Sequence, residues 1–237
     1  MSTGMISKDT DLKDLLTAGA HYGYSKSRRH PSAKEFILGS KNNIEIFDLE
    51  KTLPLLESAK DFVKNIVANG GQILFVGAKS EAKNAIKTGA DLAEMPYVTN
   101  RWIGGTITNF PEIKKRVDRL QDLLGQREKG ELSKYTKKER LLLDREIETL
   151  DKMFSGLVSM KKLPAAIFVI DPRREKTAVA EAKRKKIPVV ALAGSDCDLK
   201  QVEFSIPAND ASMASIKYFV EQIVEAIKIG RKQQKSE

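Results

Sequence analysis

Three short apolar runs, each bounded by turn residues, constrain the fold of this chain more than any other feature. They are Gly71–Gly77, Ala165–Ile170 and Ile187–Leu192. Helical periodicity follows the first run over residues 79–94 and the second over residues 175–185. Fully apolar strands joined by helices are typical of parallel sheets that are covered on both faces. The sequence therefore predicts an α/β fold with a mainly parallel sheet.

Further elements lie before and after these alternating strands and helices. Residues 35–39 and 43–47 flank a Ser-Lys-Asn turn, which predicts a β-hairpin. Helical periodicity then runs over residues 49–67, and again over residues 212–232 near the end of the chain.

Two narrow apolar stripes interrupt the alternation in the middle of the chain. Their spacing of four, three and four is that of a coiled coil, and their members are Ile113, Val117, Leu120 and Leu124, then Leu143, Ile147, Leu150 and Phe154. The polar stretch over residues 125–136 lets the two helices fold back antiparallel. We expect an inserted coiled-coil hairpin over 109–157 and a discontinuous globular domain over 1–108 and 158–237. An ordinary pair of core helices is the alternative, because short heptad runs also occur there.

The charge balance favours a polyanionic partner. The chain has 41 Lys and Arg against 32 Asp and Glu, which gives a net charge of +9. Neutralising phosphates releases condensed counterions, so this excess suits nucleic acid. A single basic cluster can equally be a solvated face.

Targeting and redox features indicate a cytoplasmic protein. The first residues lack a basic start, apolar run and cleavage site, and no apolar run approaches the roughly 20 residues that span a bilayer. Cys197 is the single cysteine and has no partner for an internal disulfide. We therefore expect no membrane partner.

Enzyme motifs are weak. Gly77–Lys79 follows a strand and opens a helix, so it could receive a phosphate, but neither the three-glycine fingerprint nor the Walker lysine motif is present. Asp171 also follows a strand, and we expect it to cap the next turn beside Pro172. No cofactor or small-molecule substrate is expected; the alternative is a nucleotide- or sugar-phosphate-binding enzyme on the same sheet.

The sequence does not predict a metal site. No pair of candidate ligands has a recognised spacing, and no local signature supports a nucleophilic thiol. The candidates are His21, His30, Asp196, Cys197, Asp198 and Asp210.

The stretch Asn100–Phe110 contains the only tryptophan and reads as a junction between sheet and hairpin. Gly104 and Gly105 let the backbone turn there. Trp102 is expected to pack between the two parts, with RNA stacking as the alternative. Arg101 can reach a phosphate. Pro111 in the first helical turn fits a helix start, and Asn109 is a candidate cap.

Six motifs in order carry a family resemblance that extends from Leu15 to Ile229. They are Ala18–Gly23, Ile46–Thr52, Ile73–Gly77, Tyr97–Phe110, Thr136–Glu139 and Ile206–Asp210. Together they closely resemble the bacterial-type small-subunit ribosomal protein S2 family. The resemblance implies a Rossmann-like (flavodoxin-like) domain with helices on both faces, an inserted coiled-coil hairpin and no catalytic activity. It also implies binding to 16S rRNA between head and body of the small subunit, beside neighbouring ribosomal proteins and ribosomal protein S1 where the organism has one.

Two segments depart from the family pattern. Residues 194–199 lack the usual proline after Asp198, and residues 28–33 lack an aromatic residue. We expect phosphate contacts, with RNA shape as the main feature recognised, from Lys26, Arg28, Arg29, Arg101, Lys114, Lys115, Lys137, Lys138, Arg173 and Arg174. A purely protein-binding adaptor working through the hairpin is a third hypothesis.

Overall fold

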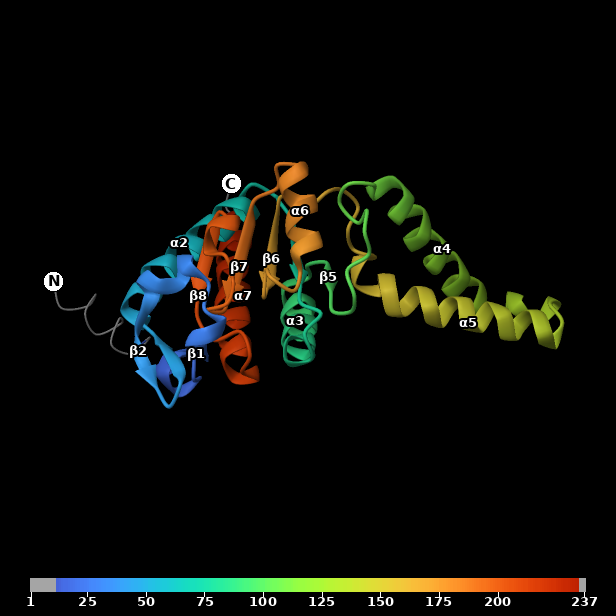
Figure 1. Ribbon diagram of the computed structural model, residues 1–237. Coiled ribbons are helices and arrows are strands. Elements are labelled where there is room, and N and C mark those ends of the chain that lie inside the picture. Colours follow the sequence, from blue (N-terminus) through green and yellow to red (C-terminus); the bar gives the residue numbers. More distant parts are fainter. Residues whose placement is uncertain (1–11, 235–237) are drawn as a thin grey trace.

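A five-stranded parallel sheet forms the centre of the protein (Figure 1). The computed structural model describes residues 12–234. The first residues, where the sequence predicts no targeting signal, lie outside the described part. The strands lie in the order β5 (Tyr97–Val98), β4 (Ile73–Val76), β6 (Ala166–Ile170), β7 (Val189–Ala193) and β8 (Phe204–Pro207). Numbered along the chain, this is 2-1-3-4-5, the flavodoxin-like order. The predicted fold class is confirmed.

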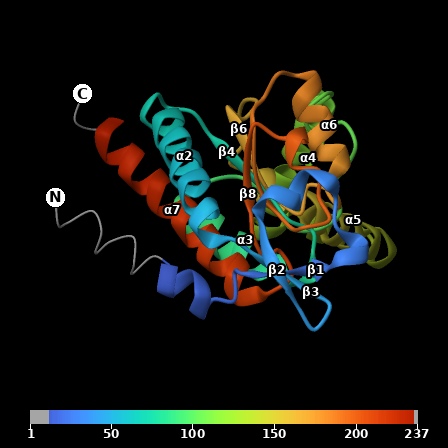
Figure 2. The same ribbon diagram turned by 60° about the vertical axis from the view of Figure 1, so that its left-hand side comes forward.

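Helices cover both faces of the sheet. Helices α2 (Leu49–Ala68), α3 (Ser80–Ala93) and α7 (Met213–Gln234) pack on one face, and α6 (Lys176–Arg184) packs on the other. Figure 2 shows α2 and α7 side by side. They approach closely at Gly230, where a Cβ would lie 2.5 Å from the Lys64 carbonyl oxygen.

A second, smaller sheet lies at the opposite end of the molecule from the hairpin (Figure 1). It is antiparallel and has the order β1 (Tyr22–Ser25), β3 (Ile44–Phe47) and β2 (Ile37–Lys41). The predicted β-hairpin is thereby confirmed as β2 and β3, and its turn residues Asn42 and Asn43 both have positive φ, as a tight two-residue turn requires. Short 3-10 turns follow β1 at Lys26–Arg28 and Pro31–Phe36.

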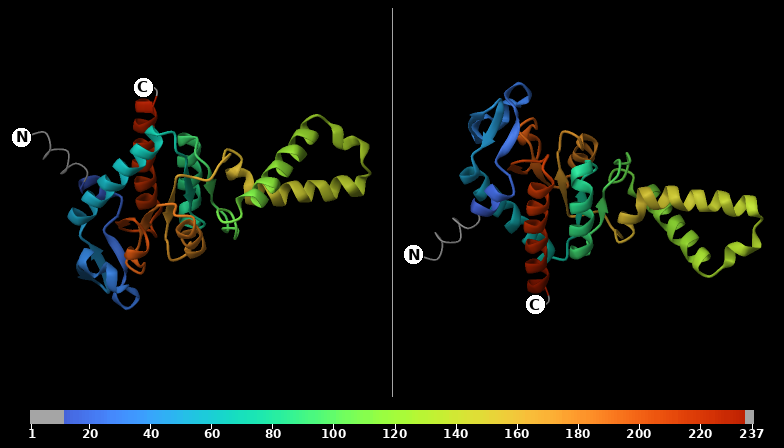
Figure 3. Two further views of the ribbon diagram at one scale, coloured as in Figure 1. Left: turned by 90° about the horizontal axis from the view of Figure 1, so that it is seen from above. Right: turned by 90° about the horizontal axis from the view of Figure 1, so that it is seen from below.

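Helices α4 (Phe110–Glu128) and α5 (Lys137–Phe154) form a hairpin that projects from the sheet (Figures 1 and 3). Six of the eight predicted seam residues are buried, whereas Leu124 and Leu143 are partly buried against the same cluster. In α4 the seam ends with the buried Leu123, where the heptad spacing predicted Leu124. A 3-10 turn at Glu131–Lys134 joins the helices, and Thr136 and Glu139 cap α5 reciprocally. Further 3-10 turns lie at Ser155–Leu157 and Leu199–Gln201.

The core continues from the sheet into the hairpin. Alternate residues of β4 face opposite sides, because Ile73 and Phe75 join the cluster under α2, α3 and α7, whereas Leu74 and Val76 join the other. That second cluster also contains Trp102 and the hairpin seam. No helix in the described part of the chain is long and apolar enough to cross a membrane.

Candidate nucleic-acid interface

The carboxyl ends of β4 and β6 form the point where the strand order reverses, which is where folds of this type bind ligands. Residues 77–79 lead into α3 at this point. The backbone N–H of Ala78, however, donates to Glu175 Oε1 at 3.1 Å. Burial raises the pKa of Glu175, and the hydrogen bond from Ala78 opposes that shift. The amide that the enzyme hypothesis assigns to a phosphate is therefore already bound to a carboxylate.

Lys79 lies beside this contact and is buried between two carboxylates. Its Nζ lies 3.3 Å from Asp210 Oδ2 and 3.5 Å from Asp171 Oδ2, and it donates to the Tyr24 hydroxyl at 2.9 Å. Burial opposes protonation of Lys79, but the Asp210 carboxylate, the hydrogen bond to Tyr24 and then the Asp171 carboxylate outweigh it, so the pKa of Lys79 lies above its ordinary value. Asp171 also accepts the Arg174 N–H at 3.0 Å, which is the predicted turn cap.

Cys197 and Asp210 are the metal-ligand candidates that the structure brings together with Asp171. Their ligand atoms lie within 4.8 Å of one another. Burial raises the pKa of the Cys197 thiol, so the thiolate that a metal requires is disfavoured, and the Lys79 ammonium already balances the carboxylates. This group fits an internal ion-pair cluster better than a metal site.

The remaining metal-ligand candidates make other contacts. His21 packs against the Tyr22 ring, with centroids 4.0 Å apart. Asp198 accepts the Lys200 N–H and lies 3.8 Å from His30. The structure therefore does not assemble the candidates into one set of ligands.

Arginines surround the acidic cluster at the protein surface. Arg28 and Arg173 both contact Asp196 Oδ2, at 3.1 and 2.8 Å, while their own side chains are 55% and 58% exposed. Asp196 thus holds two guanidinium groups side by side and leaves them open to solvent. Arg29 instead pairs at 2.9 Å with Glu45, which is fully buried, so this arginine has a structural role.

Three hollows extend this basic surface from the carboxyl edge of the sheet to the hairpin. The consecutive residues Arg173 and Arg174 line the first and the second, and Arg101 lines both the second and the third. Arg28, Arg173 and Lys176 line a hollow of about 390 Å³. Arg174 and Arg101 line the next, of about 490 Å³, and Arg101 continues into a groove of about 840 Å³ along α5. We call this surface the basic track, and it comprises Arg28, Arg173, Lys176, Arg174, Arg101, Arg145 and Lys152.

The junction between sheet and hairpin is organised by Glu181 of α6. Its Oε1 accepts from the Trp102 indole at 3.1 Å and from the Gly105 N–H at 2.8 Å. Its Oε2 accepts the N–H groups of Ile107 and Thr108, at 3.1 and 3.0 Å, and the Thr108 hydroxyl. Burial opposes ionisation of Glu181, but the hydrogen bonds from Gly105 and Thr108 outweigh it and lower its pKa.

Trp102 is buried at this junction and belongs to the cluster that joins sheet and hairpin. Gly105 has a φ of +96°, a conformation that glycine adopts without strain, whereas Gly104 faces open space. Asn109 precedes α4 but its side chain makes no capping hydrogen bond, so its prediction as a side-chain cap is wrong. The Glu181 carboxylate binds the amides of the preceding turn instead.

Comparison with known proteins decides the family. A sequence model of ribosomal protein S2 matches residues 15–230. This chain belongs to the ribosomal protein S2 family. The small ribosomal subunit protein uS2 of Desulfatibacillum aliphaticivorans is 43% identical over 220 residues, which cover 93% of this chain and 75% of that protein. The S2 family consists of non-enzymatic structural proteins, which confirms the prediction that the chain is not an enzyme and removes the phosphate-binding enzyme as an alternative.

In this S2-family protein the ten predicted RNA contacts fall into two groups. Lys26, Arg28, Arg29, Arg173, Arg174 and Arg101 lie at or beside the basic track, near the carboxyl edge of the sheet. The others are exposed on the hairpin: Lys114 and Lys115 near the start of α4, and Lys137 and Lys138 at the start of α5, near the tip.

The structure adds candidate site residues that the sequence did not predict. Arg145 and Lys152 are seven residues apart on α5 and therefore lie on one helical face. This spacing in the sequence could have identified them as a pair of neighbouring cations. Lys176 follows the Arg173-Arg174 pair closely. Glu181 could not be found in this way, because nothing local marks one glutamate in a charged helix as the partner of a loop 73–79 residues away.

Proposed function

We propose that this S2-family protein is a structural component of the small ribosomal subunit that binds 16S rRNA through the basic track. The carrying observation is that Arg101, Arg174, Arg145 and Lys152 are exposed, adjoin one another, and make no ion pair with any residue from 12 to 234. Cations without internal partners can neutralise phosphates without first breaking a salt bridge. The relative's name, a small ribosomal subunit protein, supports the proposal.

The hairpin gives the protein a second contact surface in this proposal. Residues 109–157 form an arm that projects from the globular part (Figure 3) and carries the exposed lysines Lys114, Lys115, Lys137 and Lys138. The globular unit, 1–108 with 158–237, binds RNA by shape and phosphate position. Neighbouring small-subunit proteins are further partners, including ribosomal protein S1 where the organism has it.

Replacing Arg101 and Arg174 together with glutamine should reduce the salt dependence of binding. Each phosphate contact contributes about 0.7–0.9 to the slope of log K against log salt, so the slope should become shallower by about 1.5. The measurement is binding of the full chain, from low to physiological salt, to small subunits that lack this protein. Arg119→Gln, which removes an arginine paired with Glu146, is the control and should leave the slope nearly unchanged. An unchanged slope in the double variant would contradict binding through the basic track.

Replacing Lys114, Lys115 and Arg116 with glutamate should weaken incorporation into subunits by about tenfold, because the three exposed side chains would then repel phosphate. Unfolding by urea should be little affected, since none of the three is buried. Incorporation is measured by sedimentation of a tagged copy in competition with the wild type. Lys217→Glu with Lys228→Glu, on exposed positions of α7, is the matched control. Equal incorporation of both variants would show that this part of the hairpin does not face RNA.

A further inference from the structure

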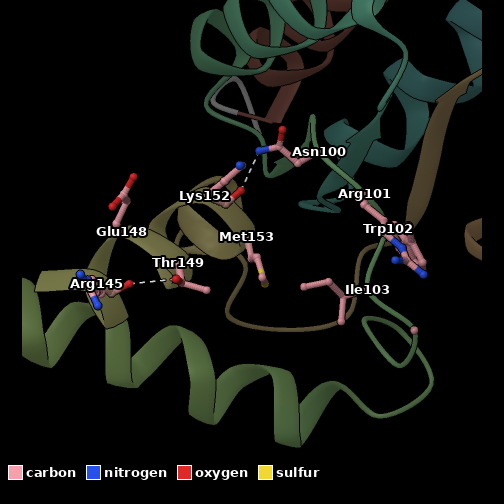
Figure 4. A pocket seen from close by; sticks show the side chains of 10 residues that line it. Asn100, Arg101, Trp102, Ile103, Arg145, Glu148, Thr149, Lys152 and Met153 are labelled. Atoms are coloured by element: carbon pink, nitrogen blue, oxygen red, sulfur yellow. Dashed lines mark hydrogen bonds between the residues drawn. The ribbon is translucent and has the colours of Figure 1, made fainter. Parts of the chain in front are cut away.

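A hollow of about 840 Å³ lies between the hairpin and the junction (Figure 4). One wall is the face of α5 that carries Arg145, Thr149, Lys152 and Met153, and the other is the segment of residues 100–104. This face of α5 is distinct from the seam that packs on α4, and its four side chains are exposed. Its volume of about 840 Å³ is within the range of sites that enclose small organic groups.

The groove combines an apolar floor with a cationic rim. Ile103 and Met153 point into it from opposite walls, and Met153 is 45% exposed (Figure 4). Arg101, Arg145 and Lys152 lie around this floor. None of the three is in an ion pair within residues 12–234, and Glu148 is the single acidic residue of the lining. The groove therefore suits a ligand that is anionic along one side and flat and apolar on the other.

We propose that this groove binds an unpaired nucleotide of the RNA, with its base against Ile103 and Met153 and its phosphate against the surrounding cations. The proposal rests on the function proposed above and adds the kind of RNA element recognised. A continuous double helix presents phosphates and hydroxyls but keeps its base faces stacked, so it would leave the floor uncovered. An unstacked nucleotide presents both surfaces at once. Because the groove is the hairpin end of the basic track and shares Arg101 with the neighbouring hollow, the strand can follow the track and turn its base inward here.

The first test places a photo-crosslinking residue, p-benzoylphenylalanine, at position 153 of the full chain. A matched control carries it at the exposed Leu142 of the same helix, outside the groove lining. After irradiation of assembled small subunits, position 153 should crosslink to 16S rRNA at a nucleotide that chemical probing shows to be unpaired, and position 142 should not reach that nucleotide. A crosslink to a protein, to a paired nucleotide only, or none at all would overturn the proposal.

The second test separates base contact from phosphate contact. Met153→Ala should weaken binding to small subunits that lack this protein by about tenfold, since loss of one base contact lowers affinity at every salt concentration. The salt slope should stay the same, because no cation is removed. Leu142→Ala is the control and should bind as the wild type does. Unchanged affinity of Met153→Ala would refute the base contact, whereas failure of the wild type to join subunits would refute the proposed function itself.

Discussion

Lys79→Met is expected to lower the free energy of unfolding by about 4 kcal/mol, because removing one partner of a buried ion-pair cluster leaves uncompensated charge. Asp210 is fully buried and Asp171 nearly so, and their carboxylates lie 3.3 and 3.5 Å from the ammonium. Methionine keeps the approximate length of the side chain but supplies no charge. The measurement is urea unfolding followed by circular dichroism. Lys87→Met, on an exposed position of the same helix, should change stability by less than about 0.5 kcal/mol.

The loss should also depend on pH. In the wild type, burial raises the pKa of Asp210 from 3.8 to about 6, with the ammonium of Lys79 limiting the rise. A raised carboxyl pKa means that the folded state binds the proton more tightly than the unfolded state does. The contribution of Asp210 to the free energy of unfolding is therefore greatest below about pH 4 and is lost as the pH rises through about 6. Without Lys79 the pKa of Asp210 rises further. The difference in free energy of unfolding between the wild type and Lys79→Met should therefore grow from pH 4 to pH 7. A small or pH-independent difference would contradict the role assigned to Lys79.

Glu181→Ala is expected to have the second largest effect, with a loss of about 3 kcal/mol. Its carboxylate accepts from three backbone amides, an indole and a hydroxyl, and unsatisfied buried donors cost about 1–3 kcal/mol each before water and relaxation recover part of this. Urea unfolding should show the loss. Hydrogen exchange should locate it, because the amides of Gly105, Ile107 and Thr108 should exchange about a hundredfold faster than in the wild type.

Glu225→Ala is the matched control, since Glu225 is an exposed residue of a long helix. It should change neither stability nor exchange at the junction. If Glu181→Ala lowered stability while the three amides kept their protection, the carboxylate would be a general stabiliser of α6 and would not hold the junction.

The central strands of the sheet could be predicted from the sequence because a strand buried on both faces is a short, wholly apolar run. β4, β6 and β7 are fully buried and consist of apolar residues, so their runs stood out. β1 and β8 were not predicted. Residues 204–207 include Ser205 and Pro207, which are compatible with the edge of a sheet but give no strand pattern by themselves.

The candidate site was less predictable than the fold. Charge clusters in the sequence located the basic segments, but only the structure shows which of these cations already form ion pairs within the protein. Arg29 and Arg174 both lie in basic clusters of the sequence. In the structure Arg29 pairs with the buried Glu45, whereas Arg174 has no ion pair within the described part of the chain. Ion pairs between residues far apart in sequence leave no local signal, and this is why Lys79 first read as part of a phosphate site.

At the point where the strand order reverses, the protein's own charged side chains occupy the place where related folds bind a ligand. A fold that binds a metabolite in this crevice gains stability that depends on the metabolite concentration, rising with its logarithm. Here the ammonium of Lys79 and the carboxylate of Glu175 are tethered to the chain, so their local concentration is constant. The globular body can therefore complete its folding before it meets RNA, and assembly can begin from a rigid, finished surface.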